Sequence, residues 1–149
     1  MPPVVWEGCR MITVRVRDKT SDVLSFDLID VLLSLGRAAT NAFWEASGVA
    51  WKMSGVGSKE ESLDATGTGA DELEALATSG ERISGTALLQ IARDVRQVIW
   101  GEFRSYGSDV SEKPITIIRA IDSTFFEVAT KDEAIMRRIR AAFADVRTV

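Results

Sequence analysis

The sequence P-I-T-I-I-R-A-I-D-S-T-F-F-E-V-A-T-K-D-E, residues 114–133, predicts two antiparallel strands followed by a helix. β-Branched residues are dense from Ile115 to Ile121, which favours a strand in the centre of a sheet. Asp122 and Ser123 are typical turn residues, and Thr124–Ala129 is predicted to return as the partner strand. This part of the chain is therefore expected to form a β-hairpin.

A helix is predicted directly after this hairpin. Thr130 and Glu133 have the spacing of a capping box, in which each side chain accepts a hydrogen bond from the other residue's backbone N–H. Arg147 is expected at the end of the helix, where the helix dipole favours positive charge. The predicted inward face holds Ile135, Ile139, Ala142, Phe143 and Val146, and the outward face holds Arg137, Arg138 and Arg140.

The amino-terminal part also begins with a strand pattern. Residues 10–17, R-M-I-T-V-R-V-R, alternate between apolar and polar side chains, which is typical of a half-buried strand. Val23–Leu28 fits two structures. Its alternation of apolar residues favours a second strand, whereas Ser25 followed by Asp27 has the pattern of a helix cap.

Three further helices are predicted in the middle of the chain. From Ile29 the apolar residues recur with the helical period, which predicts a helix to about Ala46. Asp71–Thr78 is predicted as a short helix capped by Gly80. Ser84 is expected to cap a longer helix that ends near Tyr106-Gly107.

These elements predict one α+β domain over residues 1–149. We expect an antiparallel sheet of about four strands in two hairpins, with three to four helices packed mainly on one face. Residues 48–70 are rich in glycine and acidic side chains and show no clear period, so a flexible segment is expected there.

Histidine is absent from the chain, and Cys9 is the single cysteine. Histidine is the usual proton-transfer group near neutral pH, so Ser-His-Asp, Cys-His and His-containing metal sites are excluded. We therefore expect neither a resident metal nor another cofactor, and the composition favours a function without catalysis.

The net charge is −4, but it is unevenly distributed. Residues 58–81 hold seven carboxylates and one lysine, a net charge of −6, so the remainder carries +2. An acidic balance argues against a nucleic-acid partner, which requires cations against phosphate. The chain has no apolar run of about 20 residues and no secretory signal pattern, so we expect no membrane partner and a cytoplasmic location.

Carboxylates are the remaining candidates for catalysis. Glu102, Asp122 and Glu127 are the weak candidates, because a pair of carboxylates can act on a sugar or hold Mg²⁺. Glu102 is expected at the end of the predicted 84–106 helix, and the other two on the terminal hairpin. A cross-strand ion pair between Arg119 and Glu127 is the simpler alternative.

Tryptophans and acidic residues are the candidates for binding a partner. Trp44 and Trp100 are expected beside the polar stripes of their predicted helices, with Trp51 on the same face as Trp44. Tryptophan in such positions either seals the rim of a core or anchors a partner. The acidic candidates are Glu60, Glu61 and Asp64. The arginines of the last helix are expected to complement the acidic segment.

The sequence thus favours a non-enzymatic, cytosolic protein-interaction domain. One specific form is an inhibitor or immunity-type protein whose acidic surface binds a basic partner. Two alternatives are a small carboxylate-based or Mg²⁺-dependent hydrolase, and a small-ligand module whose apolar pocket is roofed by residues 48–69. A homo-oligomer is compatible with all three.

Overall fold

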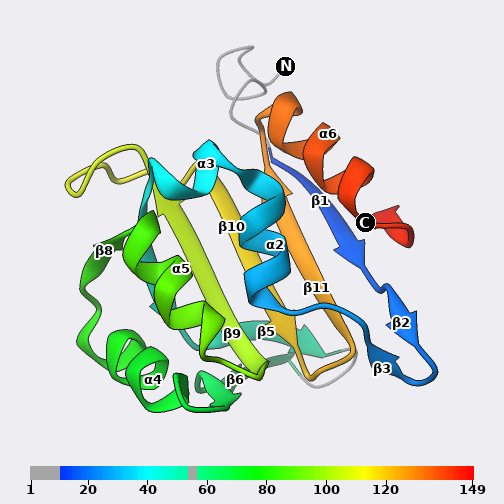
Figure 1. Cartoon of the computed structure of the whole chain (residues 1–149), viewed down its shortest axis with the longest axis horizontal. Coiled ribbons are helices and arrows are strands. Elements are labelled where there is room, and N and C mark those ends of the chain that lie inside the picture. The colour runs from blue at the N-terminus through cyan, green and yellow to red at the C-terminus, as the bar shows by residue number, and fades with distance from the viewer. Residues whose placement is uncertain (1–10, 54–56) are drawn as a thin grey trace.

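The computed structural model describes residues 11–53 and 57–149, and the side chains of these residues except 51–53 and 57–60. An antiparallel sheet with helices on one of its faces confirms the α+β class (Figure 1). The sheet has eight strands, not four, and the described residues contain five helices. Within the part that is described, no helix is long and apolar enough to cross a membrane.

The strands of the main sheet follow the order β12-β1-β11-β10-β9-β4-β8, and every pairing is antiparallel. Their bounds are β1 Ile12–Val16, β4 Phe43–Ser47, β8 Arg82–Ser84, β9 Gln97–Tyr106, β10 Thr116–Ile121, β11 Phe125–Thr130 and β12 Val146–Thr148. The strand predicted from residues 115–121 is therefore central, and the predicted carboxyl-terminal hairpin is confirmed.

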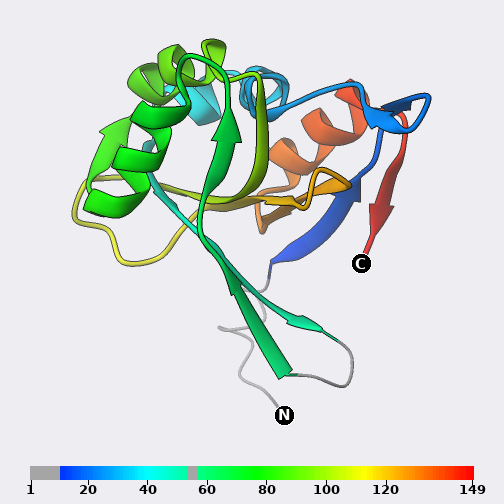
Figure 2. The same cartoon turned by 90° about the horizontal axis from the view of Figure 1, so that it is seen from below.

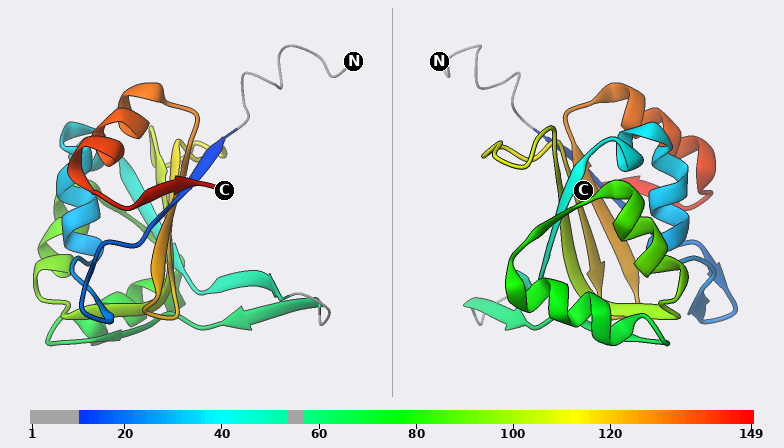
Figure 3. Two further views of the ribbon diagram at one scale, coloured as in Figure 1. Left: turned by 90° about the vertical axis from the view of Figure 1, so that its right-hand side faces the viewer. Right: turned by 60° about the vertical axis from the view of Figure 1, so that its left-hand side comes forward.

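Strand β9 is ten residues long and pairs with two strands along one of its edges. Its last residues pair with β4, and its first residues pair with β7, Asp64–Thr66. Between β4 and β7 the chain leaves the sheet as a hairpin of β5, Val49–Met53, and β6, Gly57–Glu61. This hairpin projects away from the sheet on the side opposite the helices (Figure 2; Figure 3, left).

Gly48 lies where the projecting hairpin leaves the sheet. A Cβ at this position would lie 2.3 Å from the carbonyl oxygen of Glu61, so only glycine fits between the two crossing segments. Part of the segment for which flexibility was predicted is thus regular: β5, β6 and β7 occupy much of residues 48–70, while residues 54–56 lie outside the described part.

Five helices complete the described fold. Their bounds are α2 Leu28–Leu35, α3 Arg37–Thr40, α4 Ala70–Ser79, α5 Gly85–Arg93 and α6 Glu133–Ala142. Strands β2, Lys19–Thr20, and β3, Val23–Leu24, form a small separate ladder. Both structures considered for residues 23–28 are thus partly present: a short strand comes first, and the helix begins at Leu28 with Asp27, not Ser25, as its N-cap.

Both long predicted helices were wrong in their second halves. The helix predicted from Ile29 to Ala46 stops at Gly36, whose φ of 59° does not fit a helix, and Phe43–Ser47 forms β4. The helix predicted from Ser84 ends at Arg93, and the residues from Gln97 onward form β9. Apolar residues in both stretches satisfy the period of a strand as well as that of a helix, and cross-strand pairing decides between them.

The capping residue predicted from the sequence is confirmed for α5 and was wrong for α6. Ser84 caps α5 as predicted, and its hydroxyl accepts a hydrogen bond from the N–H of Ala87. The capping box of α6 was wrong, because Asp132 is the N-cap and the Thr130 hydroxyl accepts from the Asp132 N–H. Helix α6 also ends earlier than expected, so Ala142 is exposed, and Val146 and Arg147 belong to β12.

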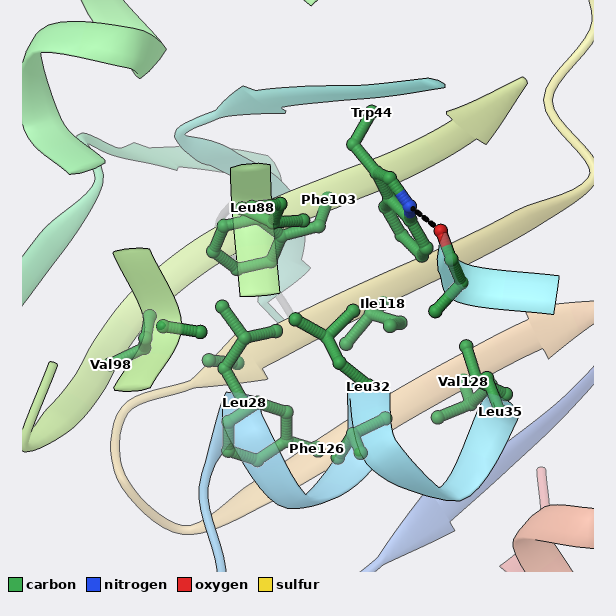
Figure 4. Close-up of a cluster of buried hydrophobic side chains, with 14 of the residues drawn as sticks. Leu28, Leu32, Leu35, Trp44, Leu88, Val98, Phe103, Ile118, Phe126 and Val128 are labelled. Atoms are coloured by element: carbon green, nitrogen blue, oxygen red, sulfur yellow. Dashed lines mark hydrogen bonds between the residues drawn. The ribbon is translucent and has the colours of Figure 1, made fainter. Parts of the chain in front are cut away.

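The core lies between the sheet and the helices (Figure 4). Valine, isoleucine and phenylalanine from alternate positions of the strands meet leucines from the helices. The fully buried members include Val14, Val16, Leu28, Leu32, Leu88, Phe103, Ile118, Phe126 and Ile139. Ile12, which shares the inward face of β1, remains 49% exposed, because it lies at the end of its strand.

Candidate interaction surfaces

The face of the sheet opposite the helices carries a row of charged side chains. The cross-strand register places Arg15 beside Glu127, Glu127 beside Arg119, and Arg119 beside Glu102. Side chains on neighbouring strands at the same register point to the same face, so the alternation continues across β1, β11, β10 and β9. We call these four residues the charge row.

Every neighbouring pair in the charge row is an ion pair. Arg15 Nε donates to Glu127 Oε2 at 2.9 Å, and Arg119 Nε donates to Glu102 Oε1 at 2.7 Å. Arg119 Nη1 lies 3.7 Å from Glu127 Oε1, so the predicted cross-strand pair between these two residues is confirmed. Glu102 is only 9% exposed and lies well inside this network.

A third arginine extends the network toward β4. Arg104 donates to Glu102 and, through Nη2, to Glu45 Oε1 at 2.9 Å. Burial lowers the pKa of the Arg104 guanidinium, but hydrogen bonds and charge from Glu45 and Glu102 outweigh that effect and raise the pKa above its ordinary value. Arg104 is thus a fixed cation, and Tyr106 also donates to Glu45 at 3.3 Å.

An apolar cluster lies beside the charge row, near the base of the projecting hairpin. Val49, Trp100 and Ile121 are buried there, and Phe125 is partly buried against them. The guanidinium carbons of Arg15 and Arg17 lie 4.6 Å and 5.2 Å from the centre of the Phe125 ring, which is the geometry of cation–π contacts. The face of the sheet opposite the helices, which we call the open face, therefore combines neutralised charge with apolar and aromatic surface.

The catalytic candidates do not form a shared acidic site. Glu102 lies in β9 and not at the end of a helix, and Arg119 stands between it and Glu127. Asp122 is exposed in the β10–β11 turn with a φ of 51°. Among the described residues, no group of three or more acidic or cysteine side chains is placed to hold a metal ion.

The tryptophan candidates lie in places that the helical prediction did not give. Trp44 is 1% exposed, and its indole nitrogen donates to the carbonyl oxygen of Ala39 at 2.9 Å, so its proposed place at a rim was wrong (Figure 4). Trp100 is 8% exposed in the apolar cluster of the open face. The backbone of Trp51 lies in β5, and its side chain lies outside the described part.

The acidic candidates precede α4 in the sequence. Glu61 ends β6, and Asp64 is exposed at the start of β7, whereas the side chain of Glu60 lies outside the described part. Helix α4 follows, and its carboxylates are exposed or half-buried. We define the acidic end as Glu61, Asp64, Asp71, Glu72, Glu74 and Glu81.

Four carboxylates of the acidic end are left without a compensating cation in the described part of the chain. In that part of the structure, no ion pair is made by Asp71, Glu72, Glu74 or Glu81. The arginines of α6 were expected to complement this segment, but α6 and α4 lie at opposite ends of the molecule (Figure 1). That expectation was wrong.

Asp27 is the N-cap of α2, the position for which the sequence pattern favoured Ser25. Its Oδ1 accepts hydrogen bonds from Leu28 N–H at 2.8 Å and from Val98 N–H at 3.0 Å, which joins α2 to β9. Burial nevertheless raises the pKa of Asp27 to about 6. The spacing D-x-x-D of Asp27 and Asp30, which forms a capping box, was the available signal.

Asp27 and Asp30 also line a groove of about 410 Å³ between the start of α2 and the start of β9, together with Arg96 and Gln97.

Comparison with protein-family models, with curated proteins and with solved structures found no match to this chain. The surfaces described above therefore carry the functional argument.

Proposed function

We propose that this chain is a non-enzymatic protein-interaction domain whose acidic end binds a basic protein. The supporting observation is the separation of charge: carboxylates that do not pair within the described structure gather along β7 and α4, far from the arginines of α6. Uncompensated charge of one sign steers an oppositely charged partner and speeds association. A cytosolic inhibitor or immunity-type protein is the form of this function that we favour.

The placement of the other glutamates supports the same assignment. Glu45, Glu102 and Glu127 are held by arginines of neighbouring strands, so they offer little charge to a partner or a substrate. A hydrolase would need a carboxyl group free to exchange protons with its substrate. Two of the three candidates for that role, Glu102 and Glu127, are engaged by guanidinium groups, and Asp122 lies apart from them in an exposed turn, so the interaction function is the better supported of the two.

The test is affinity capture from the lysate of the source cells, with the full chain immobilised at low salt. The neutralised variant carries Glu72→Gln, Glu74→Gln and Glu81→Gln, and the matched control carries Asp22→Asn, Asp109→Asn and Glu112→Gln in exposed turns. Both variants lose three negative charges, so they differ in where the charge is lost.

We expect the wild type and the control to retain a basic protein that is released as salt rises, because screening weakens surface electrostatics. The association rate of that protein should fall about tenfold or more with the acidic-end variant. Absence of any salt-released protein, or equal loss with both variants, would contradict the proposal.

A further inference from the structure

The alternation of charge across the sheet breaks down at the edge that β12 forms. The register places Arg147 of β12 directly beside Arg15 of β1, so a cation stands next to a cation. Like charges directly opposite each other destabilise a sheet, whereas every pair inside the charge row joins opposite charges. Arg17 follows the end of β1, and its guanidinium lies over the same aromatic ring as that of Arg15. We call Arg15, Arg17 and Arg147 the arginine edge.

The carboxylates near the arginine edge leave most of its N–H donors unused. Glu127 is shared with Arg119, which lies outside the edge. Asp145 lies 3.1 Å from Nε of Arg147, whose side chain is 74% exposed, so water screens this pair. Asp18 accepts instead from two backbone N–H groups that precede β12.

A guanidinium group has five N–H donors. Within the described residues, Arg15 and Arg147 each use one of these donors in a hydrogen bond, and the side chain of Arg17 makes neither a hydrogen bond nor an ion pair. The arginine edge therefore presents several donors to an anion.

Strand β12 also leaves one side of its backbone unpaired. It is the last strand in the sheet order, and Figure 3, left, looks onto its free side. The N–H of Val149 donates to the carbonyl oxygen of Thr13 at 2.9 Å. Because backbone groups alternate in direction along an antiparallel ladder, those of Val146 and Thr148 point away from β1. In the described part of the chain these outward groups have no partner.

We propose that this edge binds an extended acidic segment of another protein, which adds a strand to β12 and places carboxylates beside the arginine edge. In this mode of recognition the backbone ladder supplies affinity and the side chains supply specificity. The added residue opposite Arg147 belongs to a non-hydrogen-bonded pair, the closer of the two kinds, so its carboxylate reaches the guanidinium. Every second side chain of a strand points to the same face, so a segment with an acidic residue at alternate positions fits best.

Two observations favour a polypeptide over a nucleic acid. The ring of Phe125 already carries the guanidinium carbons of Arg15 and Arg17, at 4.6 Å and 5.2 Å, which leaves less of it for stacking a base. The unpaired backbone of β12 needs alternating N–H and C=O partners, which a peptide supplies and a nucleic acid does not.

The edge is accessible and separate from the acidic end. The projecting β5–β6 hairpin leaves the sheet beside β9, whereas β12 lies beyond β10, β11 and β1 (Figure 2). Helix α4 lies at the other end of the molecule (Figure 1). A basic protein on the acidic end and an acidic segment on β12 therefore do not compete for the same surface.

The test is fluorescence anisotropy of a labelled, blocked peptide of alternating glutamate and threonine, titrated with the full chain to about 500 µM at low salt. When the glutamates face the arginine edge, the N–H groups of the threonines face β12. A peptide that is N-methylated at the threonines loses these donors and keeps every carboxylate. Its matched control is N-methylated at the glutamates, whose N–H groups point away from β12.

We expect the parent peptide and the glutamate-methylated control to bind equally, and the threonine-methylated peptide to bind about tenfold more weakly or not at all. Arg147→Gln should weaken binding about threefold, as the loss of one exposed ion pair does. Arg93→Gln, at the exposed end of α5, removes the same charge elsewhere and should change nothing. The acidic-end variant with three glutamines should also bind the peptide normally, which separates this proposal from the function proposed above.

Three results overturn the proposal. Absence of binding up to the highest concentration shows that the edge does not take an acidic strand. Equal binding of the two methylated peptides, or equal affinities of the Arg147→Gln and Arg93→Gln variants, shows that no strand is added beside the arginine edge. Tighter binding of single-stranded oligothymidylate than of the peptide assigns the edge to a nucleic acid instead.

Discussion

The glutamates of the open face and the carboxylates of the acidic end have the same charge in opposite surroundings. Glu45, Glu102 and Glu127 lie among arginines of adjacent strands, at distances of 2.7 to 3.7 Å. Asp71, Glu72 and Glu74 lie on a helix whose last turn contains no basic residue. The first group holds strands together, whereas the second contributes little to the fold, and its electric field extends into the solvent.

The net charge of −4 therefore conceals how charge is distributed in both regions. On the open face, acid and base balance within a few ångströms, and a surface of this kind recognises geometry more than charge. At the acidic end the field extends outward, over roughly the Debye length of 8 Å at physiological salt. The two regions are therefore suited to different tasks, the cohesion of the sheet and the steering of a partner.

The largest expected effect follows from breaking the network at Glu102. Glu102→Ala leaves Arg104 and Arg119 partly buried with one carboxylate partner each, so we expect a loss of about 2–3 kcal/mol in the free energy of unfolding. Glu74→Ala on α4 should change it by no more than about 0.5 kcal/mol. Urea denaturation of the two variants measures the difference.

Glu102→Gln refines this comparison, because the amide oxygen still accepts a hydrogen bond while the charge is lost. It should cost less than the alanine variant. Equal stability of the alanine variants at positions 102 and 74 would show that the network contributes nothing to folding.

A smaller effect is expected at Asp27, which is half-buried like Glu45 and Glu127 but has no cation partner in the described part of the chain. The pKa of about 6 in the folded chain lies above the ordinary value of 3.8, so the folded state keeps its proton to higher pH than the unfolded state. Stability from this group is therefore full below about pH 4 and is lost as pH rises through 6. Asp27→Asn should raise the free energy of unfolding by about 1–2 kcal/mol at pH 7.5.

Denaturation at several pH values between 4 and 7.5 measures this effect. The asparagine oxygen can still accept from Leu28 and Val98, so the gain should vanish toward pH 4. Asp22→Asn, at an exposed turn, is the control and should show no such trend. A gain that is the same at every pH would mean that the charge of Asp27 is not its cause.

Local signals in the sequence predicted the β10–β11 hairpin, the cap of α5 and the end of α4 at Gly80, because each depends on residues that are close along the chain. They failed for β4 and β9. Trp44 and Trp100 fit a helical stripe as well as a strand, and the pairing of these two strands joins residues 59 positions apart, as in the contact of Arg104 with Glu45. Non-local pairing of this kind overrides local period.

The candidate surfaces divide in the same way. The acidic end was visible from composition, since its carboxylates follow one another along the chain. The charge row was hidden because its members come from four strands, and only the pair of Arg119 and Glu127 lies within one hairpin. Sequence order placed Glu102 in a helix, and the register that brings it beside Arg119 had to come from the structure.

The smallest effect on stability is expected at Thr78 of α4. A substitution there separates the contribution of the acidic end to folding from its contribution to binding. Thr78 is exposed in the last turn of α4, four residues after Glu74. Thr78→Lys supplies the missing cation to the helix terminus and an ion pair of the favoured order to Glu74. We expect the free energy of unfolding to rise by about 0.5 kcal/mol, measured by urea denaturation.

The same lysine reduces the field of the acidic end, so capture of a basic protein should weaken as stability improves. A surface under selection for folding alone would gain from such a cation at no cost. Thr78→Gln has a similar helix propensity without the charge, and it should leave capture unchanged. If Thr78→Lys stabilises the chain and capture stays as strong as in the wild type, the uncompensated charge of α4 has no part in binding.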